Sequence, residues 1–405
     1  MAEQNPLPKW ASRLTRAGRQ FGMLPAGALD LGYSQLHTST MLNLVQALTT
    51  PHALDRYLEL VRPTLTVRDL RAEIIEVHRG TRGSITLTLR PTRQWRGHRA
   101  GQYVQIGVLI NGVKHTRCYS PIDPQGTERG LRLTIKAHPN GLVSQYLHRH
   151  AAPGMVVDLA PAAGIFTLPD PRPDRIVLIS GGSGITPVLS MLRTLDAERH
   201  RGPVVFLHYA QSPDAVPHRA DLAAIAQRHT NFRIVLCYPE LGRSELLDGA
   251  PWNCAGSPAS GRFGYDQLER IAPWFATAET YVCGPPPLMA AVRTVYQAEQ
   301  LDDRLHSEEF TVTAAPLDPN EITGATTFSA SVTTAPNTGA PLLEQAESAG
   351  LTPEYGCRMG ICFSCTSIKR SGCTRNLRTG ELDSDPDQPI QLCINAAVGD
   401  VDIDI

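Results

Sequence analysis

Four of the nine cysteines stand in a spacing that suits metal chemistry. They are Cys357, Cys362 and Cys365, spaced C-x4-C-x2-C within GCRMGICFSC, and Cys393 in QLCIN. This is the plant-type spacing for a [2Fe-2S] cluster, and two glycines in the loop would let backbone N–H groups turn toward the sulfurs. Zinc is the main rival, but these cysteines do not form the paired knuckles of structural zinc sites. The pattern predicts an iron–sulfur cluster, with zinc and structural thiols as alternatives.

Two further motifs follow predicted strands and suit a nucleotide. After RIVLIS, the glycines Gly181, Gly182 and Gly184 would let the backbone approach a pyrophosphate at the N-terminus of the next helix. Pro187 stands where the third glycine of G-x-G-x-x-G is expected, and a tight turn without a ligand is the alternative. Cys283-Gly284-Pro285 ends another strand at the same carboxyl edge, where open α/β sheets place ligands. A buried core cysteine is the alternative there.

Two kinds of segment must position these motifs. From about residue 68 to 167, strand-like runs such as SITLTLRP and GQYVQIGV alternate with turns, which indicates a small antiparallel β-barrel. Short buried strands then alternate with helix-sized segments, which indicates an α/β domain with a parallel sheet covered by helices on both faces. A polar, proline-containing linker leads to an α+β unit with a strand (FSASVTT), a helix (PLLEQAESAG) and the cysteine loop. The predicted multidomain order is an N-terminal extension at 1–65, a barrel at 66–168, an α/β domain at 169–312, a linker at 313–325 and an α+β unit at 326–405.

The N-terminal extension has the pattern of a basic amphipathic helix. Four of its basic residues alternate with apolar residues that are spaced by four, three and four positions, which places the apolar set on one helical face. We expect this face to pack on the protein itself, with peripheral binding to a membrane surface as the alternative. The residues concerned are Lys9, Arg13, Arg16 and Arg19, with Trp10, Leu14, Ala17 and Phe21.

Composition and charge restrict the function. Hydrophobic residues make up 42% and charged residues 19% of 405 residues, which fits a globular protein of two or three domains. The net charge of -1 gives no attraction to polyanions, so we expect no nucleic-acid partner. The segment 326–405 carries ten acidic and five basic residues, which suits a basic protein partner.

The cysteine count and the N-terminus bear on the compartment. An odd number of cysteines argues against a disulfide framework. The start, MAEQNPLPKW, lacks a secretory pattern, and no run reaches the ~18 apolar residues of a membrane span. We expect a cytoplasmic monomer, with the inner membrane face as a further option. The isolated thiols are expected to be buried or incidental; these are Cys118, Cys237, Cys254 and Cys373.

Together, three motifs resemble one family. RCYS (117–120), ISGGSGITP (179–187) and CGPPPLM (283–289) occur in the order found in ferredoxin-NADP reductase-like flavoenzymes, here with a plant-type ferredoxin module at the C-terminus. WRGHRAGQYV, HPNGLVSQYLH and NLRTGELDSDPDQPIQLC make the chain similar to three-part reductases that serve membrane diiron acyl-CoA desaturases and alkane hydroxylases. The resemblance covers about residues 66 to 405. It implies a flavin-binding barrel, an NAD(P)-binding domain and a β-grasp ferredoxin domain.

The resemblance also implies roles for single residues. Arg117 would reach the flavin phosphate, Tyr119 would lie against the isoalloxazine ring, and Ser120 would bond the ring edge. Cys283 would sit beside the nicotinamide, so Tyr119, Ser120 and Cys283 are the candidate catalytic residues. An ordinary helix start capped by Asn140 is the alternative for the segment 141–144, and polar linker chemistry is the alternative for 308–310. The other cofactor-binding candidates are Lys136, Gly141, Leu142, Val143, Ser144, Gly181, Gly182, Gly184, Thr186, Pro187, Gly284, Pro285, Glu308 and Phe310.

Two departures from the family pattern concern the cofactors. Pro121 follows RCYS where an apolar residue is usual, and Gln211 stands at a position that is commonly arginine. A cation near the adenosine ribose favours the 2′-phosphate of NADPH, and Ser212, Arg219 or Arg243 are candidate substitutes. On family grounds we expect FAD rather than FMN, and NADPH slightly before NADH.

The combined cofactors predict an electron-transfer enzyme. Nicotinamide is a two-electron donor and the cluster a one-electron carrier, so a flavin must stand between them. No catalytic dyad or further substrate site is evident, so the expected acceptor is a protein, namely a membrane diiron desaturase or hydroxylase. A soluble ring-hydroxylating oxygenase is one alternative. A redox sensor or interaction module that no longer turns over nucleotide is the other.

Overall fold

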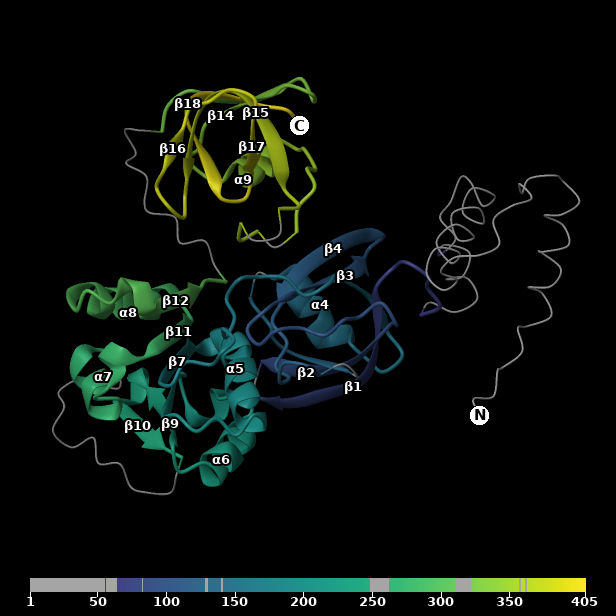
Figure 1. Ribbon diagram of the computed structural model, residues 1–405. Coiled ribbons are helices and arrows are strands. Elements are labelled where there is room, and N and C mark those ends of the chain that lie inside the picture. The colour runs from purple at the N-terminus through teal and green to yellow at the C-terminus, as the bar shows by residue number, and fades with distance from the viewer. Residues whose placement is uncertain are drawn as a thin grey trace, which may run out of the picture. The chain divides into compact units, whose positions relative to one another are not determined.

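The part of the chain that the computed structural model describes is built around three six-stranded sheets (Figure 1). The 1–65 extension lies almost wholly outside the described residues, as do much of the predicted linker and Cys254, Cys357 and Cys362. Residues 62–405 form one compact unit. The described residues are 55, 64–81, 83–127, 130–139, 141–247, 262–310, 322–356, 358–360 and 363–405.

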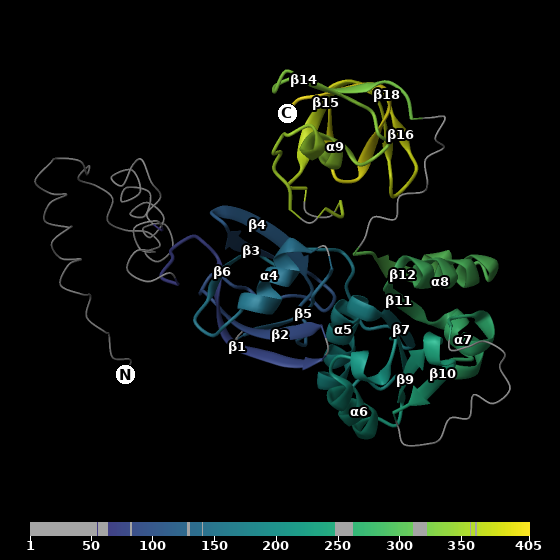
Figure 2. The same ribbon diagram turned by 180° about the vertical axis from the view of Figure 1, so that it is seen from behind.

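The first sheet is antiparallel throughout, with the strand order β4-β3-β6-β1-β2-β5. Strands β2 and β5 alternate buried and more exposed residues, as expected for a sheet with one core face. A single bridge between Pro121 and Leu133 brings the two end strands together. Helix α4 (Leu142–His150) lies beside this sheet (Figure 2). Its residues Val143 and Leu147 belong to the core of the sheet. The strands are β1 (Arg71–Thr81), β2 (Ser84–Pro91), β3 (Val104–Ile110), β4 (Val113–Tyr119), β5 (Leu131–Lys136) and β6 (Val156–Leu159).

The second sheet has the order β10-β9-β8-β7-β11-β12 and is parallel from β9 to β12. Helices α5 and α6 cover one face, while α7 and α8 cover the other (Figures 1 and 2). Because α5 leads from β7 to β8 and α8 leads from β11 to β12, the strand order reverses between β7 and β11. Open α/β sheets bind ligands at such a reversal. The elements are β7 (Ile176–Gly181), α5 (Ile185–Ala197), β8 (Val204–Tyr209), α6 (Arg219–Arg228), β9 (Phe232–Tyr238), β10 (Arg243–Leu246), α7 (Tyr265–Ile271), β11 (Glu279–Cys283), α8 (Pro286–Ala298) and β12 (Leu305–Glu308).

The third sheet is mixed, because β13 runs parallel to β18 and the other pairs are antiparallel. Helix α9 packs on it through Leu342, Leu343 and Ala346, which share a core with Cys365 and Cys393. Its identity as a β-grasp ferredoxin domain stays a prediction. The elements are β13 (Ala325–Phe328), β14 (Thr333–Pro336), α9 (Leu342–Ser348), β15 (Thr366–Asn376), β16 (Leu382–Asp383), β17 (Gln388–Gln391) and β18 (Asn395–Ile403).

The structure corrects two expectations about strands. The predicted single strand FSASVTT is a hairpin, since β13 ends at Phe328 and β14 begins at Thr333. Val332, at φ +51, takes part in the turn between them. The second sheet is not wholly parallel, because β10 folds back on β9 in antiparallel register. No described helix is long and apolar enough to cross a bilayer.

Candidate functional site

The glycine turn predicted to hold a pyrophosphate lies at the carboxyl end of β7. Gly182–Gly184 form a 3-10 turn, and α5 follows at once. Gly182 has φ +53, and a Cβ there would meet no atom within 4 Å. A Cβ at Gly184 would overlap the carbonyl group of Cys283 and would stand 2.7 Å from the backbone nitrogen of Gly284. The turn is therefore packed on one side and open on the other, which suits an anion at a helix N-terminus.

Strand β11 ends beside this turn, at Cys283. In the parallel register Cys283 pairs with Ser180 on β7 and with Glu308 on β12. Its side chain is fully buried, and burial raises the pKa of the thiol well above its ordinary value. A neutral thiol contributes shape and polarizability and is a poor nucleophile. A Cβ at Gly181 would stand 2.7 Å from Pro285 Cδ, so the two predicted motifs form one packed unit.

A cleft of about 300 Å³ opens beside the turn, between the first and second sheets. Three predicted cofactor residues line it together: Lys136 from β5, Gly182 from the turn and Thr186 from α5. The sequence prediction did not include Ser84 and Thr134, which also line the cleft. Ser84 pairs with Lys136 across β2 and β5, and Thr134 lies two residues before it on the same face. The pairing of these two strands was the signal that could have found them.

The other wall of the cleft holds two residues that the sequence analysis connected with nucleotide choice. Gln211 and Ser212 line it, together with Asp214. The two arginines considered as substitutes for Gln211 do not line it. Arg219 pairs with Glu245, and Arg243 lies over the ring of Tyr238. The described lining therefore offers one cation, Lys136, and a carboxylate.

The predicted flavin motif lies at the end of β4. Tyr119 packs on the core of the first sheet, and burial raises the pKa of its hydroxyl above the ordinary value. Ser120 is 1% exposed, and its Oγ has no hydrogen-bond partner among the described residues. Buried polar atoms rarely stay unpaired, so this hydroxyl fits a site where a ligand supplies the missing partner. The ring edge of a flavin would do so.

Arg117, predicted for the flavin phosphate, also contacts the segment that precedes the cluster cysteines. Its Nη1 donates to the carbonyl of Thr116 at 2.8 Å and to that of Gly356 at 3.1 Å. Its guanidinium carbon lies 5.4 Å from the ring centre of Tyr355. An arginine has five N–H donors, so these contacts leave donors for a phosphate. Gly356 directly precedes Cys357, so Arg117 connects the predicted flavin site with the segment that leads into the predicted cluster site.

The start of α4 fits a phosphate through its backbone. Gly141 is the N-cap and no side chain caps the helix, while Asn140 lies outside the described residues. Ser144 Oγ donates to the carbonyl of Gly141 at 3.1 Å and accepts from the amide of His138 at 3.2 Å. Val143 is buried in the core and Leu142 is exposed. The N–H groups of the first turn are therefore the groups that could donate to a phosphate, since these side chains are otherwise engaged or face solvent.

A second cavity, of about 780 Å³, is lined by residues of all three sheet regions. Tyr103 and the segment 160–166 line it from the first, Glu308 from the second, and Phe363 and Arg378 from the third. Glu308 Oε2 has no partner among the described residues. Burial raises the pKa of this carboxyl to about 8, although the positive charge of Arg378 acts to lower it. Phe310 packs against the core of the second sheet. Tyr103 and Arg378 were not predicted, because their motifs carry no signal of this cavity.

Two of the four predicted cluster ligands can be placed. Cys365 and Cys393 are 2% and 3% exposed in the core of the third sheet. Gly360, in the loop between the cysteines, has φ +72, and a Cβ there would stand 2.7 Å from Ile394 Cδ1. Within the described ranges no three metal-binding side chains gather, but Cys357 and Cys362 lie outside those ranges. Buried thiols beside a glycine loop fit the donor set of an iron–sulfur cluster.

Comparisons with known proteins find similar domains and relatives. The oxidoreductase FAD-binding domain matches residues 75–167, and the oxidoreductase NAD-binding domain matches residues 178–294. An NADPH oxidoreductase of Mycobacterium tuberculosis is 35% identical over 363 residues, covering 88% of this chain and 90% of the relative. The glycine betaine monooxygenase reductase subunit of Pseudomonas aeruginosa is 29% identical over 330 residues, covering 75% and 86%.

Among solved structures, phthalate dioxygenase reductase is similar in fold. Its TM-score is 0.56 at 22% identity, and the match covers 84% of this chain and 98% of that one. At this identity the likeness concerns the fold alone. The matched domains coincide with the first and second sheets described above.

Proposed function

The chain belongs to the ferredoxin-NADP reductase-type family of FAD- and NAD-binding oxidoreductases, and on that basis we propose that it passes electrons from NAD(P)H through FAD and a [2Fe-2S] cluster to an acceptor protein. Relatives that are reductase components of monooxygenases support an oxygenase as acceptor. When bound, nicotinamide and flavin supply hydride transfer, and the cluster supplies single-electron transfer.

The cavity of about 780 Å³ is the observation that carries this proposal. A flavin in this cavity would have the segment 160–166 and Glu308 on the side of the first two sheets, and the cysteine loop beyond. The Ser120 hydroxyl, which has no partner among the described residues, lies outside the cavity lining and supports the flavin site only as a buried group that lacks a partner. On this proposal the turn Gly182–Gly184 holds the pyrophosphate of the nucleotide and Cys283 limits the position of the nicotinamide. Electrons would then leave toward the loop of Cys365.

The acceptor is the finer part of the proposal. We propose a membrane diiron fatty acyl desaturase or hydroxylase, because the sequence resembles the reductases of those enzymes and the segment 326–405 is acidic. The exchange would take place in the cytoplasm, at the inner face of the membrane. A soluble ring-hydroxylating oxygenase is the second candidate, since the relative from Pseudomonas aeruginosa named above is the reductase subunit of a monooxygenase.

Anaerobic titration of the purified holoprotein with NADH and NADPH tests the internal electron transfer. The flavin bands are expected to bleach first and the cluster bands to follow. In Cys365→Ser the cluster absorption is expected to disappear while flavin bleaching persists. The control is Cys373→Ser, which removes a thiol on β15 that is not assigned to the cluster. No flavin bleaching with either nucleotide would overturn the reductase proposal, and retained cluster absorption in Cys365→Ser would overturn the ligand assignment.

Reconstitution tests the acceptor. The holoprotein is supplied with NAD(P)H and mixed either with a diiron acyl-CoA desaturase in phospholipid vesicles or with a soluble ring-hydroxylating oxygenase. Turnover of the desaturase is expected. Turnover of the soluble oxygenase alone would replace the first candidate with the second.

A further inference from the structure

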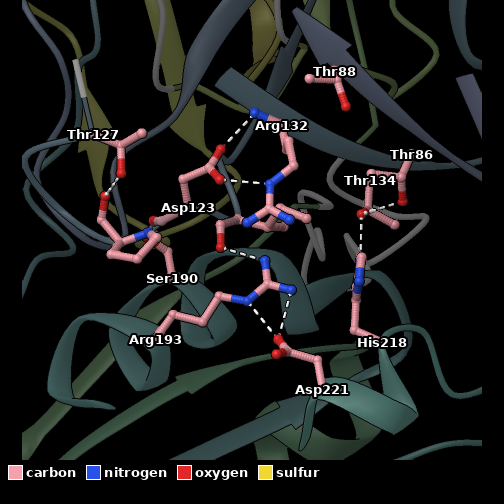
Figure 3. A network of polar contacts seen from close by, with 12 residues as sticks. Thr86, Thr88, Asp123, Thr127, Arg132, Thr134, Ser190, Arg193, His218 and Asp221 are labelled. Carbon is pink, nitrogen blue, oxygen red and sulfur yellow. Dashed lines mark hydrogen bonds and ion pairs between the residues drawn. The ribbon is translucent and has the colours of Figure 1, made fainter. Parts of the chain in front are cut away.

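A buried guanidinium joins the unit of the first sheet, here called the barrel, to the α/β domain of the second sheet (Figure 3). Arg193 lies on α5, and its side chain is 8% exposed. Its Nη1 donates to the carbonyl of Ile122 at 2.7 Å, while Nε and Nη2 both lie 2.7 Å from Asp221 Oδ2 on α6. Arg193 thereby bonds α5 directly to one segment of the barrel and links that contact to α6. A buried guanidinium donates its hydrogen bonds in fixed directions, so these bonds fix the relative orientation of the elements as well as their contact.

Two neighbours of Arg193 on α5 hold the same segment. Ser190 Oγ donates to the carbonyl of Asp123 at 2.7 Å, and Thr194 Oγ1 accepts from the amide of Gln125 at 2.9 Å. On the barrel side, the buried carboxylate of Asp123 accepts from both the backbone amide and Nε of Arg132 on β5. The segment 122–125 is therefore fastened on both sides by buried hydrogen bonds.

A second connection lies closer to the cleft. His218 Nε2 and Thr134 Oγ1 are 2.7 Å apart, and Thr134 also bonds Thr86 at 3.0 Å. His218 adopts φ +57, a left-handed conformation that costs a non-glycine residue about 1 kcal/mol or more. Thr134 lines the cleft two residues before Lys136. This contact fixes the strand that carries Lys136 against α6.

The network connects the two predicted cofactor motifs over a short path of chain. Segment 122–125 begins two residues after Ser120, and α5 begins directly after Gly184. A shift of α5 along the barrel would therefore move the nucleotide turn relative to the flavin motif. The three side-chain contacts from α5 all reach this one segment. They therefore determine the position of the nucleotide turn relative to the flavin motif.

We propose that Arg193 is a positioning residue for hydride transfer, which sets the distance between the nucleotide at Gly182–Gly184 and the flavin at Tyr119–Ser120. This inference rests on the function proposed above. In that step the C4–H bond of the nicotinamide breaks, and the hydrogen leaves with its electron pair to the flavin. The rate of such a transfer falls steeply with misplacement, about 100-fold for 1 Å.

The test compares Arg193→Lys with Arg228→Lys in the holoprotein. Lysine keeps a charge near Asp221 but cannot form both the ion pair and the bond to the Ile122 carbonyl. Arg228 makes the matched α5–α6 ion pair, with Asp196, and its side chain bonds to no barrel residue within the described ranges. Two quantities are measured: the rate constant of flavin reduction at saturating NAD(P)H, and amide hydrogen exchange of segment 122–125 without nucleotide.

Arg193→Lys is expected to slow flavin reduction about 10- to 100-fold with little change in nucleotide Kd, and to speed exchange of segment 122–125. Arg228→Lys should change neither quantity. Equal reduction rates in the two variants, or slow reduction without faster exchange, would overturn the proposal. If Arg193→Lys does not fold, Ser190→Ala is tested in its place. A smaller decrease in the rate of flavin reduction, together with faster amide exchange of segment 122–125, would support the proposal, whereas no change in either quantity would overturn it. A wild-type protein that does not reduce its flavin would instead defeat the reductase proposal, and the exchange data would still show whether Arg193 holds the segment.

Discussion

Replacing Gly184 with alanine should disturb the nucleotide site through steric overlap alone. Gly184 has φ -64, so alanine meets no backbone penalty there. Its Cβ, however, would overlap the carbonyl of Cys283 and stand 2.7 Å from the nitrogen of Gly284. These are backbone atoms at the end of β11, and no side-chain rotation can relieve the contact. The end of β11 or the turn must move.

The structure sets the size of the effect. Overpacking of a well-packed region costs about 1–3 kcal/mol, and contacts with backbone belong at the upper end of that range. We therefore expect Gly184→Ala to lower the free energy of unfolding by about 3 kcal/mol. Gly182→Ala is the matched control: it has φ +53 and open space around its Cβ, so only the left-handed conformation contributes, about 1 kcal/mol.

Urea unfolding of both variants, with flavin reduction followed by stopped flow, provides the assay. Gly184→Ala should be the less stable variant and should reduce flavin more slowly at saturating nucleotide, because Cys283 is displaced. Gly182→Ala should raise the nucleotide Kd, because its new methyl group enters the cleft. If Gly184→Ala were as stable as Gly182→Ala, the close packing of the turn on β11 would be refuted.

Three further predictions concern pH and nucleotide choice. Burial raises the pKa of Glu308 to about 8, so between pH 4.5 and pH 8 the native state holds a proton that the unfolded chain releases. The free energy of unfolding should therefore fall as the pH rises through this range, by at most about 1.4 kcal/mol per pH unit. Glu308→Gln should flatten this slope in urea titrations, and an unchanged slope would contradict the assignment. The pKa of His218 is lowered to about 4 by burial, so stability should fall as pH drops from 6.5 toward 4, and His218→Asn should remove that loss in the same titration. Gln211→Arg should lower KM for NADPH relative to NADH about tenfold, because it adds a cation to the cleft wall; an unchanged ratio would place the ribose elsewhere.

Patterns local in sequence predicted the fold of the first two sheets well. Apolar alternation and short buried runs indicated their strands, and the glycine turn and Cys283 were expected at one carboxyl edge, where the structure has them. The roles of these residues toward cofactors stay predictions, as do the domain boundaries, the ferredoxin identity of the third unit and the N-terminal helix.

What the sequence did not reveal depends on pairing between distant segments. The strand β10 is four residues long and is recognisable only by its register with β9. Ser84 enters the cleft because it pairs with Lys136, about fifty residues later. Arg193 carries no motif, and its importance lies in a carbonyl 71 positions away in sequence. Single-sequence patterns contain no information on such contacts.

The packing of β7 on β11 also restricts the order in which the chain can fold. These strands are neighbours in the sheet, yet Gly181 and Cys283 are about a hundred residues apart in sequence, whereas β7, β8 and β9 pair in succession. During synthesis the glycine turn therefore emerges long before the strand that completes it. Long-range parallel pairing is intrinsically slow, so the nucleotide site should be among the last parts of this sheet to mature, and nascent chains that end before Cys283 should have no such site.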